Sequence, residues 1–357
     1  MSDVFVLSAG RSGSTLLSRM LQEHRQICSV SEFWTSMLMQ GFGDPTVSGA
    51  AFWNMISSAP EWFRTFIAKC RSADAMPSEI IYDEEQGRYT LEDCPPIATM
   101  TLPAFDADPD VVFDALAAVV PGWGNAPVSH HASRLIALLK ERFDRQVSVE
   151  RSGLSYWYAP DMIAAYPKAR FVHLTRNGRE VLLSMRGMRM FDPIVRFSWM
   201  ISCIESRKQI LRNRMFFHHR GLSRRVMMRF ADVERVVTRQ HGRARPYSLP
   251  DRFDLERQIK VYARFWAASA ELGMKSMEAL PPDRLYTLRY EDIVADPVRT
   301  LTDLMSFVHP GRDHSAWVRS VAHMPVPQKQ RWPDLDPALA REVDQIIRPM
   351  NDRFGYV

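Results

Sequence analysis

Residues 4–17 read VFVLSAGRSGSTLL, and they predict the beginning of an α/β fold. The first four, from Val4 to Leu7, form a short apolar run that is typical of a strand buried on both faces. Gly10 and Gly13 mark a turn after this run. Apolar side chains then recur at helical spacing, at Leu16, Leu17, Met20 and Leu21. The stretch therefore predicts a strand, a glycine loop and a helix in direct succession.

The glycine loop has the composition of an anion-binding site. A loop that leads from a strand into a helix offers unpaired backbone N–H groups and the positive end of the helix dipole. Ser14 and Thr15 add hydroxyl donors, and Arg11 adds a fixed positive charge. The alternative is a plain strand-to-helix turn with a capping serine. The loop departs from the GxxxxGK[ST] pattern, because its glycines are too close and no lysine precedes the hydroxyl residues, which argues against an ordinary ATP or GTP site.

A second segment of the same kind covers residues 170–184 and reads RFVHLTRNGREVLLS. Arg176 closes the predicted strand, Asn177 and Gly178 form the turn, and Ser184 lies on the helix that follows. A guanidinium can donate paired hydrogen bonds to a phosphate, which a lysine does less well. The alternative is an arginine with a structural role.

Alternating strands and helices continue along the chain, with strands predicted at 147–149 and 285–289 and helices at 132–143 and 298–308. This alternation implies βαβ units and a parallel sheet with helices on both faces. We therefore expect a P-loop-like, three-layer α/β/α fold with a central, mainly parallel sheet, in one domain over residues 1–357. Ligands of such sheets bind at the carboxyl ends of the strands, where both glycine turns would lie. The aromatic segments around 33–128 and 186–270 are expected to be mostly helical insertions that build a substrate pocket.

Taken together and in order, these segments resemble the motifs of the sulfotransferases that depend on 3′-phosphoadenosine-5′-phosphosulfate (PAPS). The family's [KR]SG[ST]T loop corresponds to Arg11, Ser12, Gly13, Ser14 and Thr15, and its RDxRxxxxS motif to the segment from Arg176 to Ser184. The stretch at 288–297 resembles the family's RYEDL…DP segment, and Lys329 to Trp332 its C-terminal basic-Trp stretch. Arg11 places the chain nearer the tyrosylprotein and bacterial branches than the cytosolic aryl branch. Asn177 replaces the usual aspartate, at a turn position that asparagine fills easily.

The resemblance implies a reaction and a set of roles. The first motif would hold the 5′-phosphosulfate of PAPS, and Arg176 and Ser184 the 3′-phosphate. Lys329 and Arg331 would close over the phosphates, or form a solvated loop. Arg11 would stabilise the charge that grows on the bridging oxygen as a hydroxyl or amine attacks sulfur. The resemblance suggests Glu32 as the base, with Glu150 as the second candidate, and each could instead be a structural ion pair or a helix cap.

Composition limits the remaining possibilities. The net charge of +5 fits an anionic substrate, and no membrane span or signal peptide is visible, so a cytoplasmic enzyme is expected. The four cysteines form no CxxC pair and the histidines have no zinc spacing, so no metal is expected. The aromatic insertions permit a hydrophobic or aromatic small-molecule acceptor. The basic stretch at 207–245 could meet an acidic carrier protein, or be a solvated face.

Two other classes of protein remain to be distinguished from a sulfotransferase. A P-loop nucleotide kinase or hydrolase would need the missing lysine and a magnesium ion. A non-catalytic protein that binds anions or nucleic acid would use the basic stretch, and its binding would depend steeply on salt. Adenosine 3′,5′-bisphosphate distinguishes all three, because only the sulfotransferase should be stabilised by it without magnesium.

Overall fold

The structure is a computed structural model, and it describes residues 4–37, 43–72, 74, 76–105, 108–186, 255–327, 332 and 335–356. The predicted roles of Lys329, Arg331 and the basic stretch at 207–245 therefore concern residues outside the described part. The second predicted insertion, 186–270, is described only at Arg186 and from residue 255 onward.

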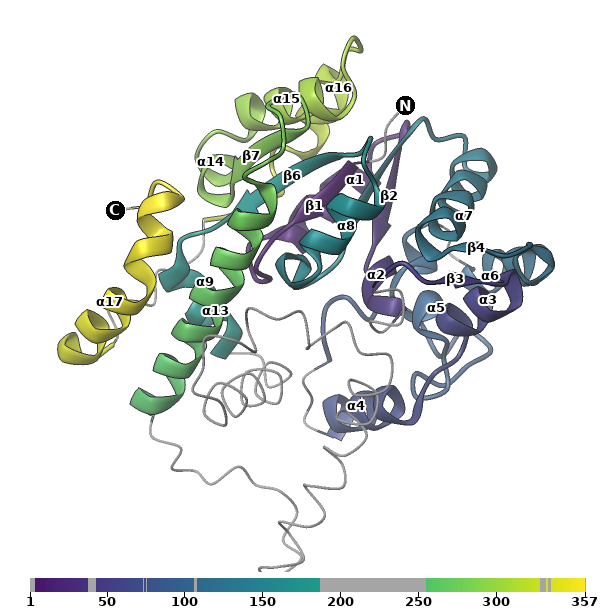
Figure 1. The fold of residues 1–357 in the computed structure, drawn as a ribbon, viewed down its shortest axis with the longest axis horizontal. Helices are drawn as coiled ribbons and strands as arrows, with labels where there is room; N and C mark the ends of the chain where they lie inside the picture. Colours follow the sequence, from purple (N-terminus) through teal and green to yellow (C-terminus); the bar gives the residue numbers. More distant parts are fainter. Residues whose placement is uncertain are drawn as a thin grey trace, which may run out of the picture.

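A five-stranded sheet forms the centre of the molecule (Figure 1). Its order is β2-β5-β1-β6-β7, and every neighbouring pair is parallel. The strands are β1 (Val4–Leu7), β2 (Ile27–Ser31), β5 (Val147–Arg151), β6 (Arg170–Thr175) and β7 (Leu285–Arg289). The predicted α/β fold is confirmed. The sequence analysis missed β2, in which Ser29 and Ser31 interrupt the apolar run.

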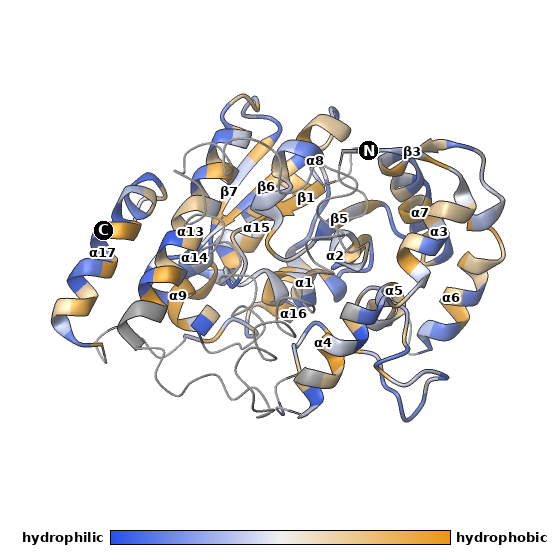
Figure 2. Ribbon diagram, turned by 60° about the horizontal axis from the view of Figure 1, so that its bottom comes forward, coloured by the Kyte–Doolittle hydropathy of each residue, from blue (hydrophilic) through white to orange (hydrophobic). Residues whose placement is uncertain are grey.

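Side chains of β1 alternate between two cores, which makes the fold three-layered. Val4 and Val6 pack with α1 (Ser14–Gln22), α15 (Pro297–Val308) and α16 (Ser315–Val321). Phe5 and Leu7 belong to a larger core on the other face of the sheet. Its helices include α7 (Val128–Arg142), α8 (Ala159–Ala165), α9 (Gly178–Arg186), α13 (Leu255–Met277) and α17 (Pro337–Arg353). Figure 2 shows hydrophobic colours on β1 and mixed colours on the outer helix α17, as expected for buried and half-buried elements.

The segment 33–128 contains short helices on the β2 side of the sheet. They are α2 (Phe33–Ser36), α3 (Gly49–Ser57), α4 (Glu61–Ser72), α5 (Pro96–Met100) and α6 (Pro109–Ala117). Two short strands, β3 (Thr46–Val47) and β4 (Ala126–Pro127), pair antiparallel and join the two ends of the segment. Phe63, Ile67 and Met100 form a small separate core beneath α4. This segment is therefore helical, as predicted.

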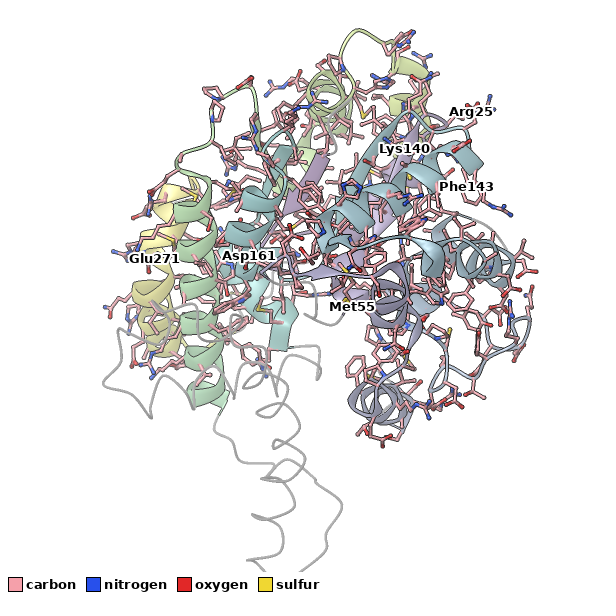
Figure 3. All side chains as sticks on the ribbon, turned by 45° about the vertical axis from the view of Figure 1, so that its right-hand side comes forward. Arg25, Met55, Lys140, Phe143, Asp161 and Glu271 are labelled. Atoms are coloured by element: carbon pink, nitrogen blue, oxygen red, sulfur yellow. The ribbon has the colours of Figure 1, made fainter. Side chains whose placement is uncertain are left out.

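Helix ends follow the capping chemistry of the sequence. Asp296 caps α15, its side chain accepting a hydrogen bond from the backbone N–H of Arg299 at 3.1 Å, and Pro297 follows at the first helical position. The short helix α14 (Tyr290–Ala295) joins β7 to this cap. Exposed helix faces carry ordinary surface pairs, such as Glu271 with Lys275 on α13. Figure 3 labels Glu271 at the edge of the molecule. Within the described residues, no helix combines the length and apolarity that a bilayer span requires.

Candidate active site

The loop from Ser8 to Gly13 turns sharply between β1 and α1. Gly10, Arg11 and Gly13 all have left-handed backbone conformations, with φ of 80°, 54° and 87°. A Cβ on Gly13 would lie 2.2 Å from Cδ2 of Tyr290, so only glycine fits against this ring. No side chain caps the first turn of α1. The helix start and the loop thus present backbone donors as an anion site requires.

The structure brings the two predicted motifs into one place. Nε of Arg11 donates to Oγ of Ser184 at 3.0 Å, and Nη1 of Arg176 donates to the carbonyl of Arg11 at 3.2 Å. The cause is the sheet order, since β1 and β6 are neighbours and both turns leave their carboxyl ends. Arg176 also stacks over the ring of Tyr290, with its Cζ 4.5 Å from the centroid. Its buried Nε has no hydrogen-bond partner in the described part of the chain.

Charge at this point favours an anion. Burial lowers the pKa of Arg11, the nearby Arg176 lowers it further, and Glu79 opposes the change. Two guanidiniums close together repel, and each is stabilised when an anionic group binds beside it. The unpartnered Nε of Arg176 offers a donor for such an anion. These residues therefore fit a phosphate group.

The start of α9 differs from the prediction, in which its backbone N–H groups would be available to bind an anion. The backbone N–H of Asn177 donates to Glu291 at 2.9 Å, and that of Gly178 donates to Asn351 at 2.9 Å. The N–H of Arg179 donates to the side chain of Asn177 at 3.0 Å, which is a local cap. Since side chains already satisfy these donors, an anion at the second turn would be held by the side chains of Arg176 and Ser184.

Glu32 lies in a buried ion pair with Arg151. Their side chains are 5% and 3% exposed, and Nη1 of Arg151 contacts Oε1 of Glu32. The other carboxylate oxygen accepts from Thr35 at 2.5 Å and from the N–H of Gly153 at 2.9 Å. Arg151 also donates to Ser31 at 2.6 Å and, more weakly, to Ser18 at 3.4 Å. The ion pair links the carboxyl ends of β2 and β5, and Arg151 connects it to α1 through Ser18.

Glu150 is buried near Glu32, but it has no ion pair in the described part of the chain. Its Oε1 accepts from Oγ of Ser152 at 2.5 Å and from the N–H of Trp34 at 3.4 Å, whereas Oε2 has no partner among the described residues. Burial raises the pKa of Glu150 to about 8, with Ser152 opposing and Glu32 adding to the rise. The carboxyl is therefore mostly protonated at neutral pH.

A sequence model of the sulfotransferase family matches residues 3–234 and 228–310, which is most of the chain. The chain belongs to the sulfotransferase family. No curated protein sequence matches it.

Solved structures similar to this sulfotransferase are distant in sequence. A sulfotransferase domain from the curacin biosynthetic pathway is 15% identical with a TM-score of 0.48, and the match covers 100% of this chain and 98% of that one. A domain from the Synechococcus PCC 7002 olefin synthase is 14% identical with a TM-score of 0.46, covering 99% and 94%. Sulfotransferase STF9 from Mycobacterium avium is 11% identical with a TM-score of 0.47, covering 100% and 78%.

The candidate site of this sulfotransferase also contains Glu79, which the sequence analysis missed. The hydroxyl of Thr15 donates to its Oε1 at 2.7 Å. Although desolvation raises the pKa of Glu79, the hydrogen bond from Thr15 and the charges of Arg151 and Arg11 outweigh it and lower the pKa. No motif surrounds Glu79, and 64 residues separate it from Thr15, so no signal in the sequence could have found it.

Among the histidines of this sulfotransferase, His131 is a buried core residue. Its Nε2 contacts the carbonyl of Val47 at 2.9 Å, and its ring stacks on Phe52 and Trp123. In the described part of the chain, no three His, Cys, Asp or Glu residues are grouped as metal ligands.

Proposed function

We propose that this sulfotransferase moves the sulfuryl group of PAPS onto a hydroxyl or amine of a small-molecule acceptor. The observation that carries the proposal is the meeting of Arg11, Arg176 and Ser184, joined by contacts of 3.0 and 3.2 Å. PAPS carries one phosphate on each side of its ribose, so a donor site needs two groups of cationic or hydroxyl donors within one nucleotide's reach. The two motifs supply these groups.

We assign the donor-binding roles as follows. The residues Arg11, Ser12, Gly13, Ser14 and Thr15 hold the 5′-phosphosulfate through backbone N–H groups, hydroxyls and the guanidinium. Arg176 and Ser184 hold the 3′-phosphate with their side chains. Lys329 and Arg331 add charge from the C-terminal stretch. Trp332 supports this last role, since Arg179 of α9 lies over its ring at 5.7 Å.

In the proposed reaction the acceptor atom forms a bond to sulfur, and the bond from sulfur to the bridging oxygen breaks. The electron pair of that bond goes to the 5′-phosphate, and adenosine 3′,5′-bisphosphate leaves. Arg11 acts on the bridging oxygen, where negative charge increases most in the transition state. The acceptor's proton goes to a carboxylate.

Glu32 is the proposed base. Its carboxylate is paired with Arg151, so accepting a proton from the acceptor requires this contact to open. Glu150, the second candidate, holds a proton of its own at neutral pH and supports the turn of Glu32 through Trp34 and Ser152. Single-turnover assays of Glu32→Gln and Glu150→Gln with a preloaded donor test this order. Equal full rates in both variants would place the base elsewhere.

The acceptor is proposed to be a small molecule, and the aromatic side chains of 33–128 suit a hydrophobic or aromatic one. The predicted acidic carrier protein depends on the stretch 207–245 and stays a prediction, as does the cytoplasmic location. A screen of hydroxylated and amino metabolites with radiolabelled PAPS would identify the acceptor.

Thermal unfolding with added nucleotides tests the proposed function. Adenosine 3′,5′-bisphosphate without magnesium should stabilise the protein, by about 2.7 kcal/mol at a hundred times its Kd. ATP should stabilise it much less. Stabilisation by ATP that requires magnesium would instead favour a kinase or hydrolase.

A further inference from the structure

Glu79 is a carboxylate that contacts residues 11–15, the anion-binding motif called the donor loop below. Its Oε1 accepts a hydrogen bond from the hydroxyl of Thr15, a residue that the proposed function assigns to the 5′-phosphosulfate. Its Oε2 accepts a weak hydrogen bond from Oγ of Ser78 at 3.3 Å. The side chain is half-buried, unlike the fully buried Glu32 and Glu150. Glu79 is therefore a partly accessible acidic group in direct contact with the donor loop.

The position of Glu79 is fixed by its own segment. The N–H of Ile80 donates to Pro77 at 3.0 Å, and that of Ile81 donates to Thr99 at 3.1 Å. Ile80 and Met76 pack against the small core of Phe63, Ile67 and Met100. The segment 33–128, which the sequence predicts to form the acceptor pocket, therefore reaches the donor loop through this carboxylate.

The charges that face Glu79 come from two neighbouring elements. They are Arg11 of the donor loop and Arg151 of β5. Arg151 is already paired with Glu32, and in the described part of the chain Glu79 has no ion pair within 4 Å of its own. Thr15 has one hydroxyl proton, so it cannot serve Glu79 and a phosphate together. A bound phosphosulfate would remove this hydrogen bond, screen Arg11 and add negative charge beside the carboxylate.

We propose that donor binding releases Glu79 from Thr15 into contact with the acceptor, so that Glu79 selects acceptors with a hydroxyl or ammonium beside the attacking atom and disfavours anionic ones. This inference rests on the proposed function. A hydrogen-bond-donating or cationic group would replace the partners that Glu79 loses, whereas a carboxylate or phosphate in the acceptor would face it as a like charge. Glu79 is thus a specificity-determining residue, and the base remains a separate group.

Donor affinity tests the release without any knowledge of the acceptor. Calorimetric titration with adenosine 3′,5′-bisphosphate compares the wild type with Glu79→Gln, and Glu61→Gln on the exposed end of α4 serves as the control. At neutral pH, Glu79→Gln should bind adenosine 3′,5′-bisphosphate roughly tenfold more tightly than the wild type. Removing a negative charge beside an anion site changes the binding equilibrium by about a factor of ten or more. The ratio should shrink on acidification as Glu79 of the wild type takes up a proton. Glu61→Gln should bind as the wild type does.

Equal affinities of the wild type and Glu79→Gln at every pH would overturn the inference and leave the proposed function intact. A wild type that does not bind the bisphosphate at all would instead overturn the proposed function.

Acceptor charge tests the selection with three phenols that share one ring. In each of them the group lies next to the phenolic oxygen: 2-(aminomethyl)phenol carries an ammonium, 2-(hydroxymethyl)phenol a hydroxyl, and 2-hydroxybenzoate a carboxylate. With radiolabelled PAPS, the wild type should prefer 2-(aminomethyl)phenol and 2-(hydroxymethyl)phenol, and Glu79→Lys should reverse the preference toward 2-hydroxybenzoate. A preference for the carboxylate phenol in the wild type, or the same preference in Glu79→Lys, would contradict the selection.

Discussion

Replacing Gly13 by alanine should destabilise the protein and weaken donor binding through one steric contact. Gly13 has φ of 87°, and a Cβ there would lie 2.2 Å from Cδ2 and 2.7 Å from Cε2 of Tyr290. The left-handed backbone costs an alanine about 1–2 kcal/mol. Moving a buried ring costs a further 1–3 kcal/mol or so, by analogy with overpacked cores. The expected loss of unfolding free energy is therefore about 2–5 kcal/mol.

The steric clash at Gly13 should also weaken donor binding, because Cζ of Arg176 lies 4.5 Å from the centroid of the Tyr290 ring. A displaced ring moves the guanidinium that we assign to the 3′-phosphate. Gly13→Ala should thus bind adenosine 3′,5′-bisphosphate at least tenfold more weakly, which corresponds to losing one charge-assisted hydrogen bond of about 1.5–3 kcal/mol.

Two other glycines separate strain from steric clash. Gly311 has φ of 75° and nothing within 4 Å of an added Cβ, so Gly311→Ala should cost only the backbone strain, about 1–2 kcal/mol. Gly122 has neither strain nor a neighbour, and Gly122→Ala should be close to neutral. Urea unfolding and calorimetric titration of all three variants measure the effects. A Gly13→Ala variant as stable as Gly311→Ala, with wild-type affinity, would refute the reasoning.

Three more outcomes are expected. Arg11→Ala should lower kcat more than tenfold in a PAPS turnover assay, and a smaller loss would remove Arg11 from the transition state. In urea titrations, the wild type should lose unfolding free energy as pH rises from 4.5 to 8, because the carboxyl of Glu150 keeps its proton up to a pKa of about 8 in the folded state and releases it near 4.5 in the unfolded state. Glu150→Gln should lose less over the same range. Parallel curves for the two proteins would contradict the assignment. Burial lowers the pKa of His24 to about 4, so the free energy of unfolding should fall as pH drops from 6.5 toward 4; a His24→Gln variant that keeps the full slope would exclude His24 as a cause.

The sequence predicted the elements that local patterns define. The strand and loop before α1, the strand that ends before Arg176, and the Asp296 cap each depend on residues close in sequence, and the structure contains them all. The parallel sheet followed from alternation alone. Since β1 and β6 are neighbours, the meeting of Arg11 and Arg176 followed from the topology.

Contacts between distant residues could not be predicted in this way. Asn351 lies 173 residues from Gly178, and its side chain satisfies the helix start that the sequence left free for a phosphate. The sequence around Glu32 does not indicate its ion-pair partner, because Arg151 lies 119 residues away. The ordinary pKa of a glutamate gave no sign that burial keeps Glu150 protonated. Folding creates each of these states.

The affinity of Arg176→Ala for two nucleotides tests the central claim most directly. If Arg11 and Arg176 hold opposite ends of one nucleotide, Arg176→Ala should lower the affinity for adenosine 3′,5′-bisphosphate about 10- to 100-fold and leave that for adenosine 5′-monophosphate unchanged, whereas Arg11→Ala should weaken both. Equal losses for both nucleotides in Arg176→Ala, or no loss for either, would contradict the claim.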